Sequence, residues 1–173
     1  MDAMQEVSSN GAAARDMAGA AADGRPRQFI TFTIGAEEYG VDIMAVREIK
    51  GWTETTILPQ SPPHVRGVIN LRGVIVPIYD LRARFGMGSS EPTKSHVVII
   101  VAVRSRVVGL LVDGVSDILT VETGAVRAVP ELDRRGDADF LDGLVALDTR
   151  MVTLISLDRL FRGERSEAEV PTQ

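Results

Sequence analysis

The chain has 173 residues, of which 45% are hydrophobic and 25% are charged, and it contains no cysteine. This length accommodates one sizeable domain or two small ones. The formal net charge of −5 argues against binding by bulk attraction to nucleic acid or to acidic membranes. The lack of cysteine excludes disulfides, a thiol nucleophile and a thiolate metal site, and it fits a reducing compartment.

The ends of the chain differ in composition from its middle. Residues 1–27 are rich in alanine, glycine and small polar residues without apolar periodicity, so we expect a disordered N-terminal tail, and a second polar tail over 163–173. The N-terminus lacks the apolar segment of a secretory signal, and no stretch approaches the ~20 apolar residues of a membrane helix. We therefore predict a cytoplasmic protein with an ordered region over 28–162.

The ordered region alternates short β-branched runs with Gly, Pro and polar turns, a pattern typical of barrel-type β architectures. The expected strands cover, in chain order, residues 29–34, 39–43, 68–69, 74–76, 97–103, 107–112, 143–147 and 151–156. A helical turn is expected at 46–49, and short helices at 81–85, after the capping residue Asp80, and at 157–161. No helical pattern is long enough to form the crossovers of a parallel sheet.

The most informative stretch is 67–85. Its β-branched runs flank a turn at 70–73, so we expect a hairpin, with Gly73 tolerating the positive φ that such turns often require. The turn presents the guanidinium of Arg72, which suits recognition of a carboxylate or a backbone oxygen. The alternative is that Arg72 is simply a solvated turn residue.

The chain also contains an internal duplication. Residues 67–85 align without a gap on 143–161, and five of the 19 pairs are identical. In the preceding parts, Val46 aligns with Val115, Glu48 with Asp117, and Ile49 with Ile118.

We therefore predict two similar small barrels, from repeat halves of about 29–86 and 97–162, with an exchange of strands between the halves left open. Each half alone is of marginal size for a core, so the halves should pack together and leave a groove at their seam. The exposed turn of the first copy, 70–73, differs from its counterpart 146–149 and is the better candidate for a functional site.

Motifs for catalysis are missing. His64 and His96 lack the spacing of metal ligands, and the sequence has neither a G-x-S-x-G elbow nor a phosphate-cradling glycine motif. We expect no metal, no cofactor and no enzymatic activity. Trp52 either anchors a partner or covers the end of a barrel.

Four segments, taken together and in this order, resemble the CheW family of bacterial chemotaxis coupling proteins. They are 37–43, 46–49, 66–73 with its continuation from Pro77 to Arg82, and 107–119, and the resemblance covers 28–161. It implies an all-β fold of two intertwined, SH3-like, five-stranded β-barrels with short helices.

The resemblance further implies a non-enzymatic adaptor that couples methyl-accepting chemoreceptors to the histidine kinase CheA. Such an adaptor supports assembly of the receptor array and control of the kinase, and it lies in the cytoplasm at membrane-bound arrays without inserting into the membrane. Three alternatives stay open: a small-ligand-binding β-barrel, a coupling protein of a chemosensory pathway that does not control flagella, and an enzyme of unknown type.

The resemblance also implies two binding surfaces. A groove for the helical tip of a receptor would be formed by Val46, Glu48, Ile49, Gly67, Asn70, Arg72, Gly73, Val97 and Val115. Val46, Ile49 and Val115 would supply its apolar floor, and Arg72 with Glu48 would fix the register of the helix. A surface for the C-terminal regulatory domain of CheA would include Arg127, Glu131 and Leu132, where family members often have an aromatic residue at the last position.

Overall fold

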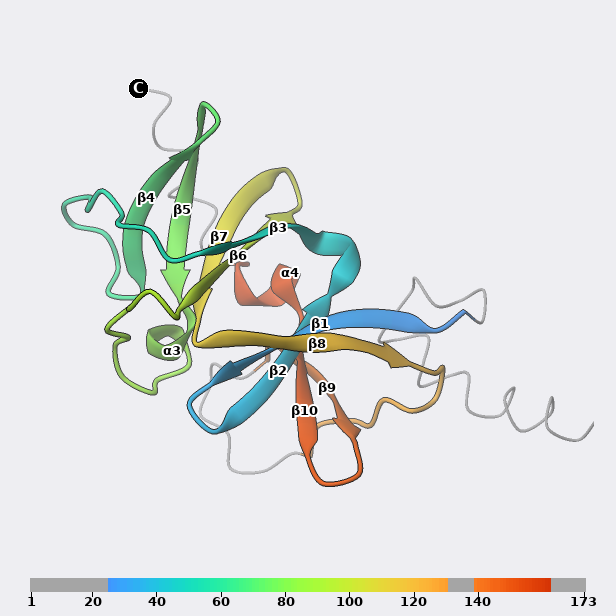
Figure 1. Ribbon diagram of the computed structural model, residues 1–173. Helices are drawn as coiled ribbons and strands as arrows, with labels where there is room; N and C mark the ends of the chain where they lie inside the picture. Colours follow the sequence, from blue (N-terminus) through green and yellow to red (C-terminus); the bar gives the residue numbers. More distant parts are fainter. Residues whose placement is uncertain (1–24, 131–138, 163–173) are drawn as a thin grey trace, which may run out of the picture.

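The structure is a computed structural model that describes residues 25–130 and 139–162 (Figure 1). The expected tails over 1–27 and 163–173 lie outside the described residues, apart from residues 25–27. The first strand already begins at Arg27, one residue before the expected start of the ordered region.

The described residues form ten strands and three short helical segments. The strands are β1 (Arg27–Ile34), β2 (Glu37–Asp42), β3 (Val46–Gly51), β4 (Val65–Leu71), β5 (Val74–Asp80), β6 (Val97–Val103), β7 (Arg106–Val112), β8 (Gly114–Val121), β9 (Leu141–Ala146) and β10 (Met151–Ile155). The helical segments are the 3-10 turn η2 (Ile43–Ala45), α3 (Leu81–Arg84) and α4 (Leu157–Leu160). Neither α-helix is long enough or apolar enough to cross a membrane.

The strands form two five-stranded sheets, which confirms the predicted all-β fold class. Sheet A has the order β8-β1-β2-β10-β9, and sheet B has the order β3-β6-β7-β5-β4. The two orders become identical when each strand is replaced by its counterpart in the duplication, so that β1 matches β6, β2 matches β7, and β3 matches β8. Each sheet is therefore one barrel of a pair with the same topology.

Each sheet takes strands from both halves of the sequence (Figure 1). The first half contributes β1 and β2 to sheet A, and then passes through η2 to contribute β3, β4 and β5 to sheet B. Two parallel pairs, β2 with β10 and β5 with β7, join strands of different halves. Because of this exchange, neither half forms a barrel by itself.

The buried side chains fall into three clusters. The largest lies between the sheets and combines residues of both, for example Phe32 and Val41 of sheet A with Ile99 and Leu110 of sheet B. Each sheet also encloses a smaller cluster of its own. The shared cluster explains why two small barrels form one stable unit, since each alone encloses few buried side chains.

Both short α-helices begin where they were expected. The carboxylate of Asp80 accepts a hydrogen bond from the Arg82 N–H at 3.1 Å, and the Ser156 hydroxyl accepts one from the Arg159 N–H at 3.3 Å. These contacts satisfy N–H groups that have no partner within the first turn of a helix.

The helical turn expected at 46–49 is wrong. The helical segment ends at Ala45, and the following residues form the strand β3, which pairs with β6. Ile49 lies opposite Ile99, and its side chain is 43% exposed. This β-branched segment pairs with β6, which lies about fifty residues further along the chain. The local spacing of apolar residues does not reveal this pairing.

Candidate functional site

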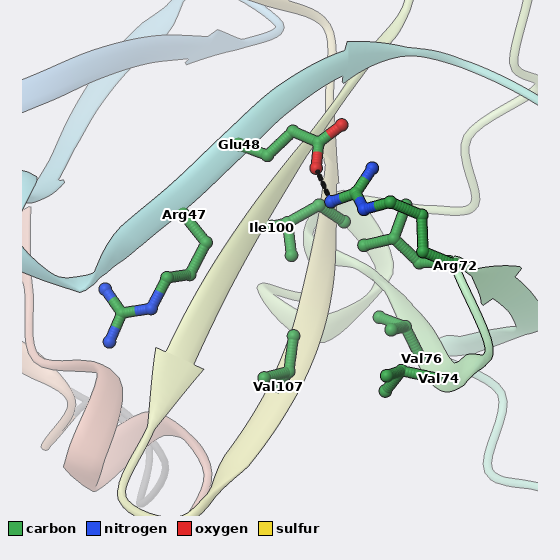
Figure 2. A pocket seen from close by; sticks show the side chains of 8 residues that line it. Arg47, Glu48, Arg72, Val74, Val76, Ile100 and Val107 are labelled. Carbon is green, nitrogen blue, oxygen red and sulfur yellow. Dashed lines mark hydrogen bonds and ion pairs between the residues drawn. The ribbon is translucent and has the colours of Figure 1, made fainter.

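A groove of about 440 Å³ opens on sheet B (Figure 2). Its lining comes from β3, β6, β7 and the β4–β5 hairpin, and consists of Arg47, Glu48, Leu71, Arg72, Val74, Val76, Ile100 and Val107. Apolar side chains form most of this lining, and the three charged residues lie on β3 and on the hairpin turn. The groove therefore belongs to one sheet, whereas the sequence predicted a groove at the seam between the two halves.

The hairpin turn consists of two residues, Arg72 and Gly73. Leu71 pairs with Val74 across it, and the two turn residues have φ values of 51° and 91°. Two-residue turns with positive φ match the twist of the flanking strands, and glycine adopts this conformation at little cost. The side chain of Asn70 supports the turn by accepting a hydrogen bond from the Gly73 N–H at 2.8 Å.

Arg72 reaches from this turn to Glu48 on β3. Its Nη2 donates to Glu48 Oε1 at 2.7 Å, which links the edge strand β3 to the hairpin turn at the other edge of sheet B (Figure 2). The hydrogen bond from Arg72 and the positive charge of its guanidinium lower the pKa of Glu48, against an opposing effect of partial desolvation. The same contact raises the pKa of Arg72. The side chain of Arg72 is 72% exposed, so its remaining N–H groups can reach a partner.

The structure brings only part of the expected receptor-binding set into this groove. Glu48 and Arg72 line it, and Asn70 with Gly73 shapes the turn beside it. The half-buried side chains of three others, Val46, Val97 and Val115, pack against the shared core cluster. Ile49 is exposed on β3, but it does not line the groove.

The apolar lining of the groove was missed from the sequence. Val74 and Val76 lie on the same face of β5 because the side chains of a strand alternate between its two faces. The hairpin pattern in the sequence was therefore sufficient to predict this part of the lining. Ile100 and Val107 come from β6 and β7 in the second half of the chain. Their place in the groove depends on the exchange of strands, which the hairpin alone does not reveal.

Gly67 fixes the backbone at the other end of β4. Its φ is +141°, and a Cβ atom at this position would collide with the backbone carbonyl oxygen of Thr56. The close approach permits two hydrogen bonds of 2.9 Å between the backbones of Thr56 and Val68. Glycine is therefore required here for close contact with the preceding loop. Trp52, at the start of that loop, packs on the cluster inside sheet B, with the Arg66 guanidinium 5.9 Å from its ring centroid.

One of the three residues expected to face the kinase lies in the described part of the chain. Arg127 forms two backbone hydrogen bonds of 2.8 Å with Leu144 on β9, which attaches it to sheet A. Glu131 and Leu132 lie outside the described residues. Within the described ranges, no group of three or more His, Cys, Asp or Glu side chains is placed to hold a metal ion.

Two five-stranded barrels that exchange strands, with an open groove on one of them, define a class of twin-barrel proteins, and comparison with known proteins identifies the family. The model of the CheW-like domain matches residues 28–165. The probable chemotaxis protein CheW of Rhizobium etli is 51% identical over 142 residues, which cover 82% of this chain and 92% of that protein. The chemotaxis protein CheW of Klebsiella aerogenes is 42% identical over 80% of this chain and 83% of its own.

A solved structure agrees with these relatives. The crystal structure of the scaffolding protein TtCheW from Thermoanaerobacter tengcongensis matches with a TM-score of 0.73 and 32% identity, covering 80% of this chain and 94% of that one. The chain belongs to the CheW family of chemotaxis scaffold proteins. The resemblance found in the sequence is thereby confirmed, and with it the role of a chemotaxis scaffold.

Proposed function

We propose that this protein couples the cytoplasmic helical tips of methyl-accepting chemoreceptors to the histidine kinase CheA, at membrane-bound receptor arrays. It acts as a scaffold without catalysing a reaction. The groove on sheet B supports a binding role, because its lining combines apolar side chains with an arginine–glutamate ion pair. A nucleophile with an adjacent general base, which covalent catalysis requires, does not occur in this lining.

The groove is the proposed receptor site. A receptor tip is a helical hairpin, and one of its helices can place an apolar stripe on the valines of β5 and β7. The Glu48–Arg72 pair stands at the rim of this apolar surface, where it can fix the position of the helix. Asn70, Gly73 and Gly67 shape the hairpin, and Ile49 is exposed on β3 next to Glu48. Val46, Val97 and Val115 pack against the shared core cluster.

Arg127, the one described residue of the proposed kinase surface, lies on the other barrel. Arg127 is attached to sheet A, and the receptor groove is formed by sheet B alone. With Glu131 and Leu132, Arg127 would contact the regulatory domain of CheA. Separate barrels for the two partners allow both to bind one copy of the chain at the same time. In an array, such bivalent contacts reinforce one another without high affinity at either site.

The observation that carries this proposal is the ion pair at the rim of an apolar groove in a member of a scaffold family. The test is to mix the protein with the kinase and a receptor fragment, and to measure phosphorylation of the kinase. The proposal predicts that the receptor changes kinase activity only when this protein is present. Equal kinase activity with and without the protein, at concentrations that saturate every pairwise contact, would contradict it.

A further inference from the structure

Strand β3 contains a bulge that determines which side chains face the groove. Val46 lies opposite Val101 on β6, and Glu48 lies opposite Ile100, so Arg47 is an extra residue without an opposite partner. In a regular strand, neighbouring side chains point to opposite faces, and Arg47 would then point away from Glu48. A bulge re-aims a side chain. Here both Arg47 and Glu48 line the groove (Figure 2).

The same bulge occurs in the other barrel. On sheet A, Val115 of β8 lies opposite Phe32 and Asp117 lies opposite Thr31, which leaves Ser116 as the extra residue. Ser116 is the counterpart of Arg47 in the duplication. The bulge therefore belongs to the repeated framework, whereas the residue that it displays does not. Sheet B has an arginine at the position where sheet A has a small, uncharged side chain.

The charges in the groove are unevenly paired. Glu48 is engaged with Arg72 at 2.7 Å, whereas the Arg47 Nη1 atom donates to the backbone oxygen of Met44 at 3.1 Å. Among the described residues, no ion pair involves Arg47, although a guanidinium has five N–H donors. In Figure 2, Arg47 and Arg72 lie on opposite sides of the groove, with Ile100 and Val107 between them.

We propose that Arg47 binds a carboxylate of the partner that occupies this groove. The preferred partner is then an amphipathic helix that carries an acidic side chain on the flank of its apolar stripe. A helix seated on the apolar lining removes water from Arg47, which costs free energy unless an opposite charge faces it. This inference rests on the proposed receptor groove. It adds that the positive charge of Arg47 favours helices with an acidic side chain at the matching position.

The experiment compares two variants with the same change in net charge. R47E reverses the charge in the groove, and K94E reverses the charge of an exposed lysine in the loop before β6. The full chain is titrated with the soluble cytoplasmic fragment of a chemoreceptor, and the dissociation constant is measured by calorimetry. We expect R47E to weaken binding by about tenfold or more, because like charges are brought together. K94E should change it by less than about twofold, and R47Q should lie between the two.

A charge reversal in the partner identifies the contact. Each acidic residue at the tip of the receptor fragment is changed to lysine in turn, and one such variant should bind R47E at least about fivefold better than it binds the wild-type chain. The inference is overturned if R47E binds the fragment as tightly as the wild type, or if no lysine variant restores binding. If the wild-type chain itself does not bind the fragment, the proposed receptor groove fails as well. Circular dichroism of each variant verifies that the fold is kept.

Discussion

Gly40 on β2 and Gly109 on β7 occupy equivalent positions in the two barrels, but the space around them differs. A Cβ atom on Gly109 would lie 2.5 Å from Ile78 Cδ1 and 2.9 Å from Val98 Cγ1. At Gly40 the closest atom would be Leu154 Cδ2, at 3.2 Å. Sheet B is therefore packed more tightly at this position than sheet A, although the two barrels share one topology.

This difference predicts unequal effects of the same substitution. Gly109→Ala should lower the free energy of unfolding by about 1–3 kcal/mol, because an added methyl group displaces buried side chains. Gly40→Ala should cost less, since a neighbour needs to move by only a few tenths of an ångström. Urea unfolding followed by the fluorescence of the single tryptophan measures both variants. A larger loss for Gly40→Ala would show that the two environments have been ranked wrongly.

The sequence predicted the repeated framework better than it predicted the groove. The alignment of Val46 with Val115 holds in three dimensions, because each precedes the extra residue of an equivalent bulge. The spacing of Val46 and Ile49 nevertheless predicted a helical turn at 46–49, where the structure has a strand. The bulge at Arg47 interrupts the alternation that would have indicated a strand. This error followed from using local spacing for a segment whose conformation is set by pairing with β6.

The composition of the groove was predicted only in part, for a related reason. Glu48 and Arg72 were identified through the family resemblance and the displayed turn, and the structure places them 2.7 Å apart. Ile100 and Val107 were missed because they enter the groove through pairs between the two halves of the chain. Contacts between segments far apart in the sequence depend on topology, which hydrophobic periodicity does not determine.

Asp80 is a buried carboxylate that holds the loop after α3, and its removal should destabilise the protein. It accepts hydrogen bonds from the Ser90 N–H at 2.8 Å, from the Ser90 hydroxyl at 2.7 Å, and from the Arg82 N–H at 3.1 Å. Asp80→Ala leaves these donors without their acceptor and should cost about 2–4 kcal/mol. Chemical unfolding gives the loss, and amide exchange at Ser90 should become faster.

Ser90→Ala is the matched control for this prediction. It removes the hydroxyl but keeps the bond from the Ser90 N–H to Asp80, so its effect should be smaller than that of Asp80→Ala. Equal losses for the two variants would mean that the side-chain hydroxyl, and not the carboxylate as a whole, holds the loop.

The ion pair of Glu48 predicts how this carboxyl titrates. Because Arg72 lowers its pKa in the folded protein, the midpoint should lie below the ordinary value of 4.5. A lowered pKa in the folded state means that the contribution of the carboxylate to stability is complete above the pKa of the unfolded chain. That contribution is lost as the pH falls through the lower, folded value. The carboxyl carbon of Glu48, followed by NMR from pH 7 downward, measures this midpoint.

Arg72→Ala provides the comparison for the titration. Without the hydrogen bond, only the effect of partial desolvation and the charge of Lys50 remain among the causes of the shift, so the pKa of Glu48 should rise. A midpoint that is the same in both proteins would show that the contact with Arg72 does not persist in solution.

The same variant tests the role of Arg72 in signalling. Since this side chain is 72% exposed and belongs to a turn, Arg72→Ala should keep the fold and lower the melting temperature only slightly, because an exposed ion pair contributes little to stability. It should reduce receptor-dependent kinase activation by at least about fivefold, because alanine cannot donate the charge-assisted hydrogen bonds that the guanidinium can make to a partner. Arg72→Lys keeps the charge but loses the planar fork, and should give an intermediate value. Activation by Arg72→Ala equal to that of the wild type, in an assay where K94E is also fully active, would remove Arg72 from the receptor site.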